Sequence, residues 1–252
     1  DIDGLKASLS ADISSIEFNY NSQDTSELLV NANSIITVNN YVNNVGINGE
    51  GDLELHILNP SAEVNVNNII LNNSDLTLDI QNISNAALDQ LGANNIYVMN
   101  NGTANLSLGV IVDGSALNVA GFNDVTFNSD LILANLDLNV VNDIIQTDGS
   151  NIEIVGGVLD IEAGGDIYVT QISSNNVIDN TVIINSVGSV VDVNDSQVDF
   201  IIDHAEVLNI TAGVTLAEFE VSYDSVDPVD PVDPVDPVDP VDPTTTTTTT
   251  TT

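Results

Sequence analysis

Residues 152–169 of this 252-residue chain read IEIVGGVLDIEAGGDIYV, and apolar residues alternate with other residues in three short segments of it. The alternating pairs are Ile152/Ile154, Leu159/Ile161 and Ile167/Val169. A period of two places such side chains on one face of a β-strand, whereas a helix needs spacings of three and four. Ala163-Gly164-Gly165-Asp166 lies between the second and third segments, and its glycines allow a sharp corner. The stretch therefore predicts strands joined by a tight corner.

The same alternation continues on both sides of this stretch. Further apolar sets with this period are Leu53/Leu55/Ile57, Leu76/Leu78/Ile80, Leu136/Leu138/Val140, Val191/Val193 and Val198/Phe200/Ile202. We predict that the interior includes Leu76, Leu78, Leu136, Leu138, Ile152, Ile154, Val191 and Val193. Only residues 84–95, SNAALDQLGANN, have a helical pattern, and residues 4–18 fit either a short helix or a first strand.

Evenly spaced short strands are typical of a sandwich or of a solenoid. The solenoid is favoured because Pro60 is the only proline before the C-terminal tail, hairpin signals are few, and asparagine pairs recur that would stack at corners. We predict an all-β fold, a parallel β-helix or solenoid with about 20 residues per coil. Residues 1–30 would form an N-terminal cap or donor segment and residues 31–222 the solenoid. Residues 223–252, with VDP repeats and a threonine run, would be an extended tail.

The stretch GGVLDIEAGGDIYVTQISSNN, residues 156–176, resembles the repeats of filamentous-haemagglutinin-type secreted adhesins. In that family, strands of alternating apolar residues are joined by a corner like Ala163–Asp166. The resemblance implies a right-handed parallel β-helix on a bacterial surface. The motif of the family's N-terminal secretion domain does not occur in this sequence.

The charge of the chain is extreme: 38 acidic residues oppose Lys6 alone, and the formal net charge is −37. This composition excludes binding to nucleic acid, phosphates or anionic membranes, which need clustered Lys and Arg. Divalent cations, neutral glycans and other copies of the chain remain as partners. A hydrophobic content of 42% provides a core, and no apolar run is long enough to span a membrane. The start at Asp1, the acidity and the tail together indicate a secreted, cell-surface or extracellular protein, although an excised fragment would also begin without Met.

Three acid pairs would lie on outward strand faces, namely Asp75/Asp79, Asp192/Asp195 and Asp199/Asp203. Stacked acids could chelate Ca²⁺, the one cofactor that they would suit, but we favour a solvated acidic face, because no GGxGxD repeat and no EF-hand loop occurs. We expect no enzyme activity, because no nucleophile, phosphate-loop or zinc motif occurs. His56 and His204 are interpreted as surface residues. A carbohydrate-active β-helix enzyme stays as an alternative, since acid-rich chains offer carboxylate pairs.

The glycosylation candidates are six sequon asparagines and the threonine run. They are Asn72, Asn82, Asn101, Asn105, Asn194, Asn209, Thr244, Thr245, Thr246, Thr247, Thr248, Thr249, Thr250, Thr251 and Thr252. With the predicted fold, they indicate an extracellular structural protein: a subunit of a glycosylated surface filament or adhesive stalk, assembling head to tail with itself. A monomeric Ca²⁺-binding adhesin module is the other alternative.

Overall fold

A computed structural model describes most of the chain between Lys6 and Val221. The described residues are 6–10, 19–20, 26–31, 36–38, 40–42, 52–58, 63–81, 83–102, 104–147, 149–174, 180–192, 198–202, 205–216 and 219–221. None of them is helical, and so none lies in a helix that could cross a membrane.

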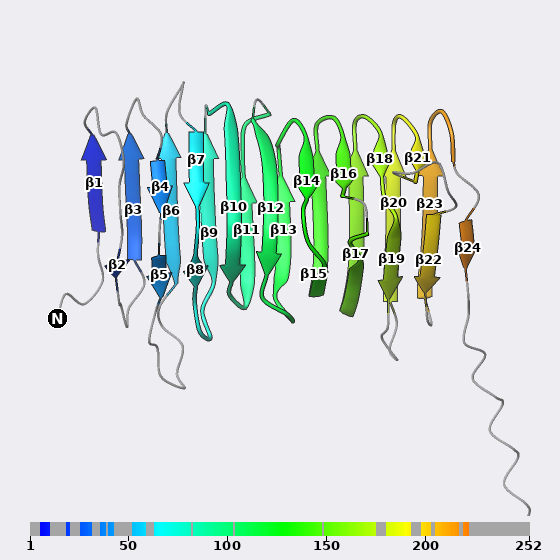
Figure 1. Cartoon of the computed structure of the whole chain (residues 1–252), viewed down its shortest axis with the longest axis horizontal. Helices are drawn as coiled ribbons and strands as arrows, with labels where there is room; N and C mark the ends of the chain where they lie inside the picture. The colour runs from blue at the N-terminus through cyan, green and yellow to red at the C-terminus, as the bar shows by residue number, and fades with distance from the viewer. Residues whose placement is uncertain are drawn as a thin grey trace, which may run out of the picture.

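The strands belong to two sheets, and within each sheet they follow one another along the long axis of the molecule (Figure 1). The first sheet contains β1 (Lys6–Ser10), β3 (Ser26–Asn31), β6 (Leu53–Leu58), β9 (Leu76–Gln81), β11 (Asn95–Met99), β13 (Ala116–Ala120), β15 (Leu131–Val140), β17 (Ile152–Ala163), β19 (Gln171–Ser174), β20 (Asn180–Ser186), β22 (Val198–Ile202), β23 (Ala205–Ala212) and β24 (Phe219–Val221). The second contains β2 (Asn19–Tyr20), β4 (Ile36–Val38), β5 (Asn40–Val42), β7 (Glu63–Val66), β8 (Ile69–Ile70), β10 (Asn85–Gly92), β12 (Asn105–Ile111), β14 (Val125–Phe127), β16 (Ile144–Gln146), β18 (Ile167–Tyr168) and β21 (Val190–Val191).

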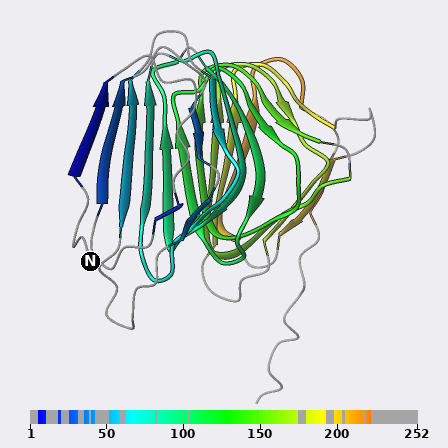
Figure 2. The ribbon, with the colours of Figure 1, turned by 60° about the vertical axis from the view of Figure 1, so that its left-hand side comes forward.

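Through the centre of the molecule the chain alternates between the sheets, from β9 to β18, so each strand pairs with the strand one coil away. Every strand pair is parallel; β13 and β15, for example, align Leu117 with Leu136. Figure 2 shows these coils wound around a common interior. The protein is therefore a parallel β-solenoid, and the predicted fold class is confirmed.

The coil changes shape toward the C-terminus, where the first sheet divides. β17 pairs through Ile152–Ile154 with β19 and through Val158–Ala163 with β20. A register shift separates the same two segments in the pairing of β15 with β17. Each long strand thus turns a corner within its own length, and β20 continues the face that carries the groove described below.

Aliphatic side chains stack in columns inside the coil. One column, in register across six strands, contains Leu76, Ile96, Leu117, Leu136, Leu159 and Val182, all with at most 2% exposure. Burying one such side chain contributes roughly 1.5–3 kcal/mol. Because strands one coil apart supply equivalent positions, similar side chains pack on one another, and alternation along each strand is what builds the core.

Most predictions of interior residues are confirmed. Leu76, Leu78, Leu136, Leu138, Ile152 and Ile154 are fully or almost fully buried. The prediction for Val191 is wrong, because Val190 and Asp192 point inward while Val191 lies partly exposed opposite Tyr168. Because Val190 and Val191 are both apolar, alternation in the sequence does not determine which of them points inward. Val193 lies outside the described residues, as do the side chains of Val198, Phe200 and Ile202.

The helix predicted over 84–95 is also wrong, since Asn85–Gly92 forms β10. This strand is paired on both sides: Ala86 and Leu88 align with Val64 and Val66 of β7, and with matching positions of β12. Two ladders of backbone hydrogen bonds outweigh the weak local helix propensity of an Ala–Leu stretch.

In the N-terminal segment, Lys6–Ser10 is a strand that pairs with β3. Residues 1–30 therefore contribute β1, β2 and most of β3 to the two sheets. The tail predicted over 223–252 lies outside the described residues.

Candidate binding groove at a corner of the solenoid

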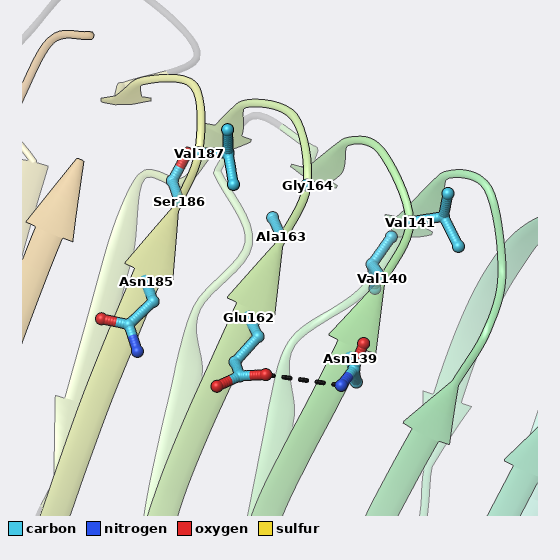
Figure 3. A pocket seen from close by; sticks show the side chains of 9 residues that line it. All are labelled: Asn139, Val140, Val141, Glu162, Ala163, Gly164, Asn185, Ser186 and Val187. Carbon is cyan, nitrogen blue, oxygen red and sulfur yellow. Dashed lines mark hydrogen bonds between the residues drawn. The ribbon is translucent and has the colours of Figure 1, made fainter. Parts of the chain in front are cut away.

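An open groove of about 470 Å³ runs along the corner that follows β15, β17 and β20. Three successive coils contribute equivalent residues to it, which form three rows across the coils (Figure 3). An outward row, here called the polar row, consists of Asn139, Glu162 and Asn185. The floor consists of Val140, Ala163 and Ser186. The outer edge of the groove consists of Val141, Gly164 and Val187.

The strand register brings these residues together. Asn139 is aligned with Glu162, and Glu162 with Asn185. The alignment persists beyond the strands, because the N–H groups of Val141, Gly164 and Val187 each donate to a carbonyl one coil back at 2.8–3.0 Å. Gly213 makes the equivalent bond to Ser186 at 3.0 Å. We call Val141, Gly164, Val187 and Gly213 the corner row.

The corner row is apolar and uneven. Val141 is 52% exposed and Val187 is 70% exposed, while Gly164 between them has no side chain. Gly164 cannot readily be replaced, because a Cβ atom there would lie 2.1 Å from the carbonyl oxygen of Val141. The close approach of the two coils therefore creates a notch between two valine ridges.

The polar row supplies amide and carboxylate groups. Asn139 Nδ2 donates to Glu162 Oε2 at 3.4 Å, and the Thr211 hydroxyl donates to Asn185 Oδ1 at 2.7 Å. These side chains stand on parallel strands beside the floor (Figure 3). Such a row offers hydrogen bonds at intervals of one coil, about 4.8 Å.

An acidic patch adjoins the polar row on the same face. Asp137 and Asp160 are aligned neighbours, and Glu162 lies two residues after Asp160. Burial raises the pKa of Asp160, and the charges of Asp137 and Glu162 raise it further. The buried Oδ1 of Asp160 has no hydrogen-bond partner among the described residues. Asn118 Nδ2 relieves part of the repulsion by donating to Asp137 Oδ2 at 2.8 Å.

Beyond the groove, the corner ends in a ladder of aspartates. Asp124 Oδ1 accepts from the N–H of Asp143 at 3.2 Å, Asp143 Oδ1 from that of Asp166 at 2.7 Å, and Asp166 Oδ1 from that of Ser189 at 2.6 Å. The hydrogen bond from the Ser189 backbone lowers the pKa of Asp166, and the Tyr168 hydroxyl, which donates to Oδ2 at 3.0 Å, lowers it as well. The same contact with Asp166 raises the pKa of Tyr168. The predicted corner at Ala163–Asp166 thus lies between β17 and β18, and its Asp ties one coil to the next.

The structure places four of the six sequon asparagines on the surface. Asn72 and Asn101 lie in corners, Asn105 begins β12, and Asn209 lies on β23; all four are exposed. Asn82, Asn194 and Thr244–Thr252 lie outside the described residues. None of the four lines the groove at the corner row.

The predicted acid pairs are engaged in local hydrogen bonds where the structure describes them. Asp75 Oδ1 accepts from the side chain of Asn95 at 2.8 Å, and Asp79 Oδ2 lies 3.2 Å from His56 Nδ1. The outward orientation predicted for Asp192 is wrong, because this residue is almost fully buried. Asp195, Asp203, His204 and the side chain of Asp199 are outside the described part. Within that part, no group of three or more His, Asp or Glu side chains could hold a metal ion.

His56 points outward, as predicted, and lies between two carboxylates. In addition to its contact with Asp79, its Nε2 is 3.6 Å from Glu54 Oε2. All three residues are on outward positions of adjacent strands β6 and β9. The arrangement suits a surface ion pair that forms when the imidazole is protonated, and such exposed pairs contribute little to stability.

The groove is not apparent from the sequence. Its rows depend on aligning VVND at 140–143, AGGD at 163–166 and SVGS at 186–189, whose spacing is wider than the coil of about 20 residues that the sequence predicts. Aligning the chain on Asp143 and Asp166 would have revealed the alternation of valine and glycine. What the groove offers is an extended site with apolar notches beside hydrogen-bonding side chains.

No family model, no curated protein and no solved structure matches this chain. The resemblance of residues 156–176 to filamentous-haemagglutinin-type adhesins therefore stays a prediction from the sequence.

Proposed function

We propose that this protein is an extracellular structural subunit that assembles head to tail into a surface filament or adhesive stalk. The observation that carries the proposal is the open, all-parallel stacking of its sheets. Within the described residues, β1 pairs only with β3 at one end of the first sheet, while β24 pairs only with β22 and β23 only with β20 at the other, so both ends present strand edges without a partner.

Unpaired edges are templates for further strand pairing. The two ends of a parallel stack differ, so one end of a copy would meet the opposite end of the next. Such a contact is heterologous and does not close, which yields a fibre rather than a ring. The exposed Asn72, Asn101 and Asn105 lie along the sides of the stack, where glycans would leave the ends accessible, whereas the exposed Asn209 lies on the end strand β23.

Electron microscopy and light scattering of the full chain test assembly directly. We expect fibres one solenoid wide and a scattering mass that rises with concentration. Proline at Ala7 and, separately, at Ser8 provides a matched pair, because adjacent N–H groups of a strand point to opposite sides. One variant should lose assembly while keeping the melting temperature, whereas the other should disturb pairing with β3. A monodisperse monomer at all concentrations would contradict the proposal.

The groove favours a second candidate, a monomeric adhesin module whose ligand lies along the coils. Sizing separates the two candidates, since a module that binds without assembling would remain a monomer in the presence and absence of ligand.

The raised pKa of Asp160 beside Asp137 and Glu162 is the feature that favours a carbohydrate-active enzyme. We propose no catalytic role: a polysaccharide lyase would need Lys or Arg to stabilise the developing anion, and Lys6 is the only such residue in the sequence. Release of reducing sugar from polysaccharides that disappears in Asp160→Asn would overturn this view.

A further inference from the structure

The corner row alternates Val, Gly, Val, Gly over four successive coils, so its notches recur every second coil. Two notches result: the one at Gly164 lies between Val141 and Val187, and the one at Gly213, the last member of the row, is bounded by Val187 on one side. A Cβ atom at Gly213 would lie 2.1 Å from the carbonyl oxygen of Val187, just as one at Gly164 would lie 2.1 Å from that of Val141. The two-coil period is therefore fixed by backbone contacts and does not depend on the rotamers of surface side chains.

The spacing of the notches matches a second period in the same sequence. Adjacent coils are about 4.8 Å apart, so the notches lie about 9.6 Å apart. The VDP repeats favour polyproline-II geometry, with a rise of about 3.1 Å per residue, which places their valines about 9.3 Å apart. The repeated valines are Val226, Val229, Val232, Val235, Val238 and Val241.

We propose that the VDP repeats of residues 226–243 dock on the corner row of their own chain, with successive valines in the notches at Gly164 and Gly213. The ridge at Val187 would then lie beneath the Asp-Pro unit between two valines. This is a binding site for an extended segment with an aliphatic residue at every third position, and it is independent of the proposed assembly into filaments.

The chain is long enough for this contact. Residues 222–225 link Val221, the end of β24, to Val226, and the repeats continue from there to Pro243. At about 3.1 Å per residue, the segment from 222 to 243 spans up to about 68 Å. A covalent tether also gives the segment an effective concentration in the millimolar range, which lowers the affinity that docking requires.

Charge opposes docking and provides a diagnostic signature. Each repeat carries one Asp, Glu162 lies in the polar row between Asn139 and Asn185, and the chain as a whole is strongly anionic. The two asparagines are two coils apart, so their amides are spaced to donate to the carboxylates of successive repeats, while Glu162 repels those carboxylates. Salt shortens the Debye length from about 30 Å at 0.01 M to about 3 Å at 1 M. Docking through valines should therefore become stronger as salt is added.

Cysteine trapping tests the proposal in the full chain, which has no native cysteine. One cysteine replaces Val187 and a second is moved through positions 232–240, one variant at a time, under mild oxidation. Disulfides require Cα atoms within about 7 Å. Docking predicts intrachain disulfide formation that is severalfold faster at one position in every three, with the same phase in each repeat, and faster at high salt than at low salt.

Matched variants separate docking from chance encounters. In Val110→Cys, which replaces another exposed valine (49%, against 70% for Val187) on β12, the rates should show no period of three. In a second control, the scan against Val187→Cys is repeated with every repeat valine except the one at the scanned position replaced by serine. The period of three in the disulfide rates should then disappear. Uniform rates along the scan, or rates that fall with added salt, would overturn the proposal. Products of dimer mass on denaturing gels would also overturn it, because they would assign the groove to the tail of a second copy.

Discussion

The sequence determines the walls of this solenoid, which are the strands of its two sheets, in a different way from its corners, where the chain passes from one strand to the next. In the walls, alternation along each strand buries residues such as Leu136 and Leu138, and many aliphatic side chains would serve equally well. In the corners, single contacts decide the structure: Gly164 is needed because a carbonyl lies where a Cβ would be, and Asp166 because the N–H of Ser189 needs an acceptor. A strand in a wall needs only the alternation of apolar and polar residues, so one aliphatic residue can replace another. A corner depends on contacts between individual atoms.

The comparison predicts the largest effect for a charge placed inside a wall. Leu138→Asp should lower the free energy of unfolding by about 3–5 kcal/mol or prevent folding, because a fully buried carboxylate would have no partner. Asn139→Asp is the matched control, since Asn139 follows Leu138 in the same strand but points outward and is exposed. Urea unfolding followed by circular dichroism measures both. Similar losses in the two variants would contradict the inward and outward assignment of β15.

A smaller but clear effect is expected for Gly164→Ala. The new Cβ would meet the Val141 carbonyl, and relief of that contact should cost about 1–3 kcal/mol. Gly157→Ala is the control, because nothing lies within 4 Å of a Cβ at that position in β17, the strand that leads into the corner. Thermal melts of the two variants should differ by several degrees. Equal melting temperatures would show that the corner adapts more readily than its backbone contacts indicate.

Asp166→Ala should cost about 1 kcal/mol at neutral pH, since the N–H of Ser189 loses its acceptor. The pKa of Asp166 is lowered from its ordinary value of 3.8 in the folded state. The contribution of the Asp166 carboxylate to the free energy of unfolding is therefore fully present above pH 3.8. It is lost as the pH falls through the lower pKa of the folded state. Comparing urea midpoints of wild type and variant between neutral pH and about pH 3 tests the sign. A difference that grows on acidification would contradict it.

The smallest effect is expected for Asp160→Asn, and its sign is opposite. Because the folded pKa of Asp160 is raised, the folded state favours the protonated form, and the charged form is unfavourable at neutral pH. The amide should stabilise the fold at neutral pH by less than about 0.5 kcal/mol, because solvent screens this partly exposed group. The gain should shrink as the pH falls and the wild-type carboxylate becomes protonated. Destabilisation by Asn at neutral pH would indicate that the carboxylate makes a favourable contact.

The wall residues were the predictable part of the molecule. Leu76, Leu78, Leu136 and Leu138 alternate with polar neighbours, so their inward orientation follows from period two alone. Val191 was placed on the wrong face because Val190 is equally apolar. The local pattern predicts a helix over 84–95, but local propensity does not include the strand partners that residues 85–92 find one coil away on either side.

The candidate groove was beyond prediction from single segments. Its rows require the relative register of three coils, and coil length is not constant: the step from Leu117 to its partner Leu136 is shorter than the step from Leu136 to Leu159. A pattern of fixed period therefore fails at the corners. The Ala163–Asp166 corner was nevertheless identified, because two adjacent glycines before an aspartate favour a turn in almost any context.

The central claim is that neighbouring coils stack in parallel with this register, and one pair of cysteines tests it most directly. Asn118 and Asp137 are aligned partners on β13 and β15. The double variant Asn118→Cys, Asp137→Cys should therefore form an intrachain disulfide rapidly, with the melting temperature kept or raised. Asn118→Cys, Thr126→Cys joins β13 to the next strand along the chain, which lies in the other sheet, and it should not form one. A disulfide in the second pair and none in the first would indicate an antiparallel hairpin and contradict the solenoid.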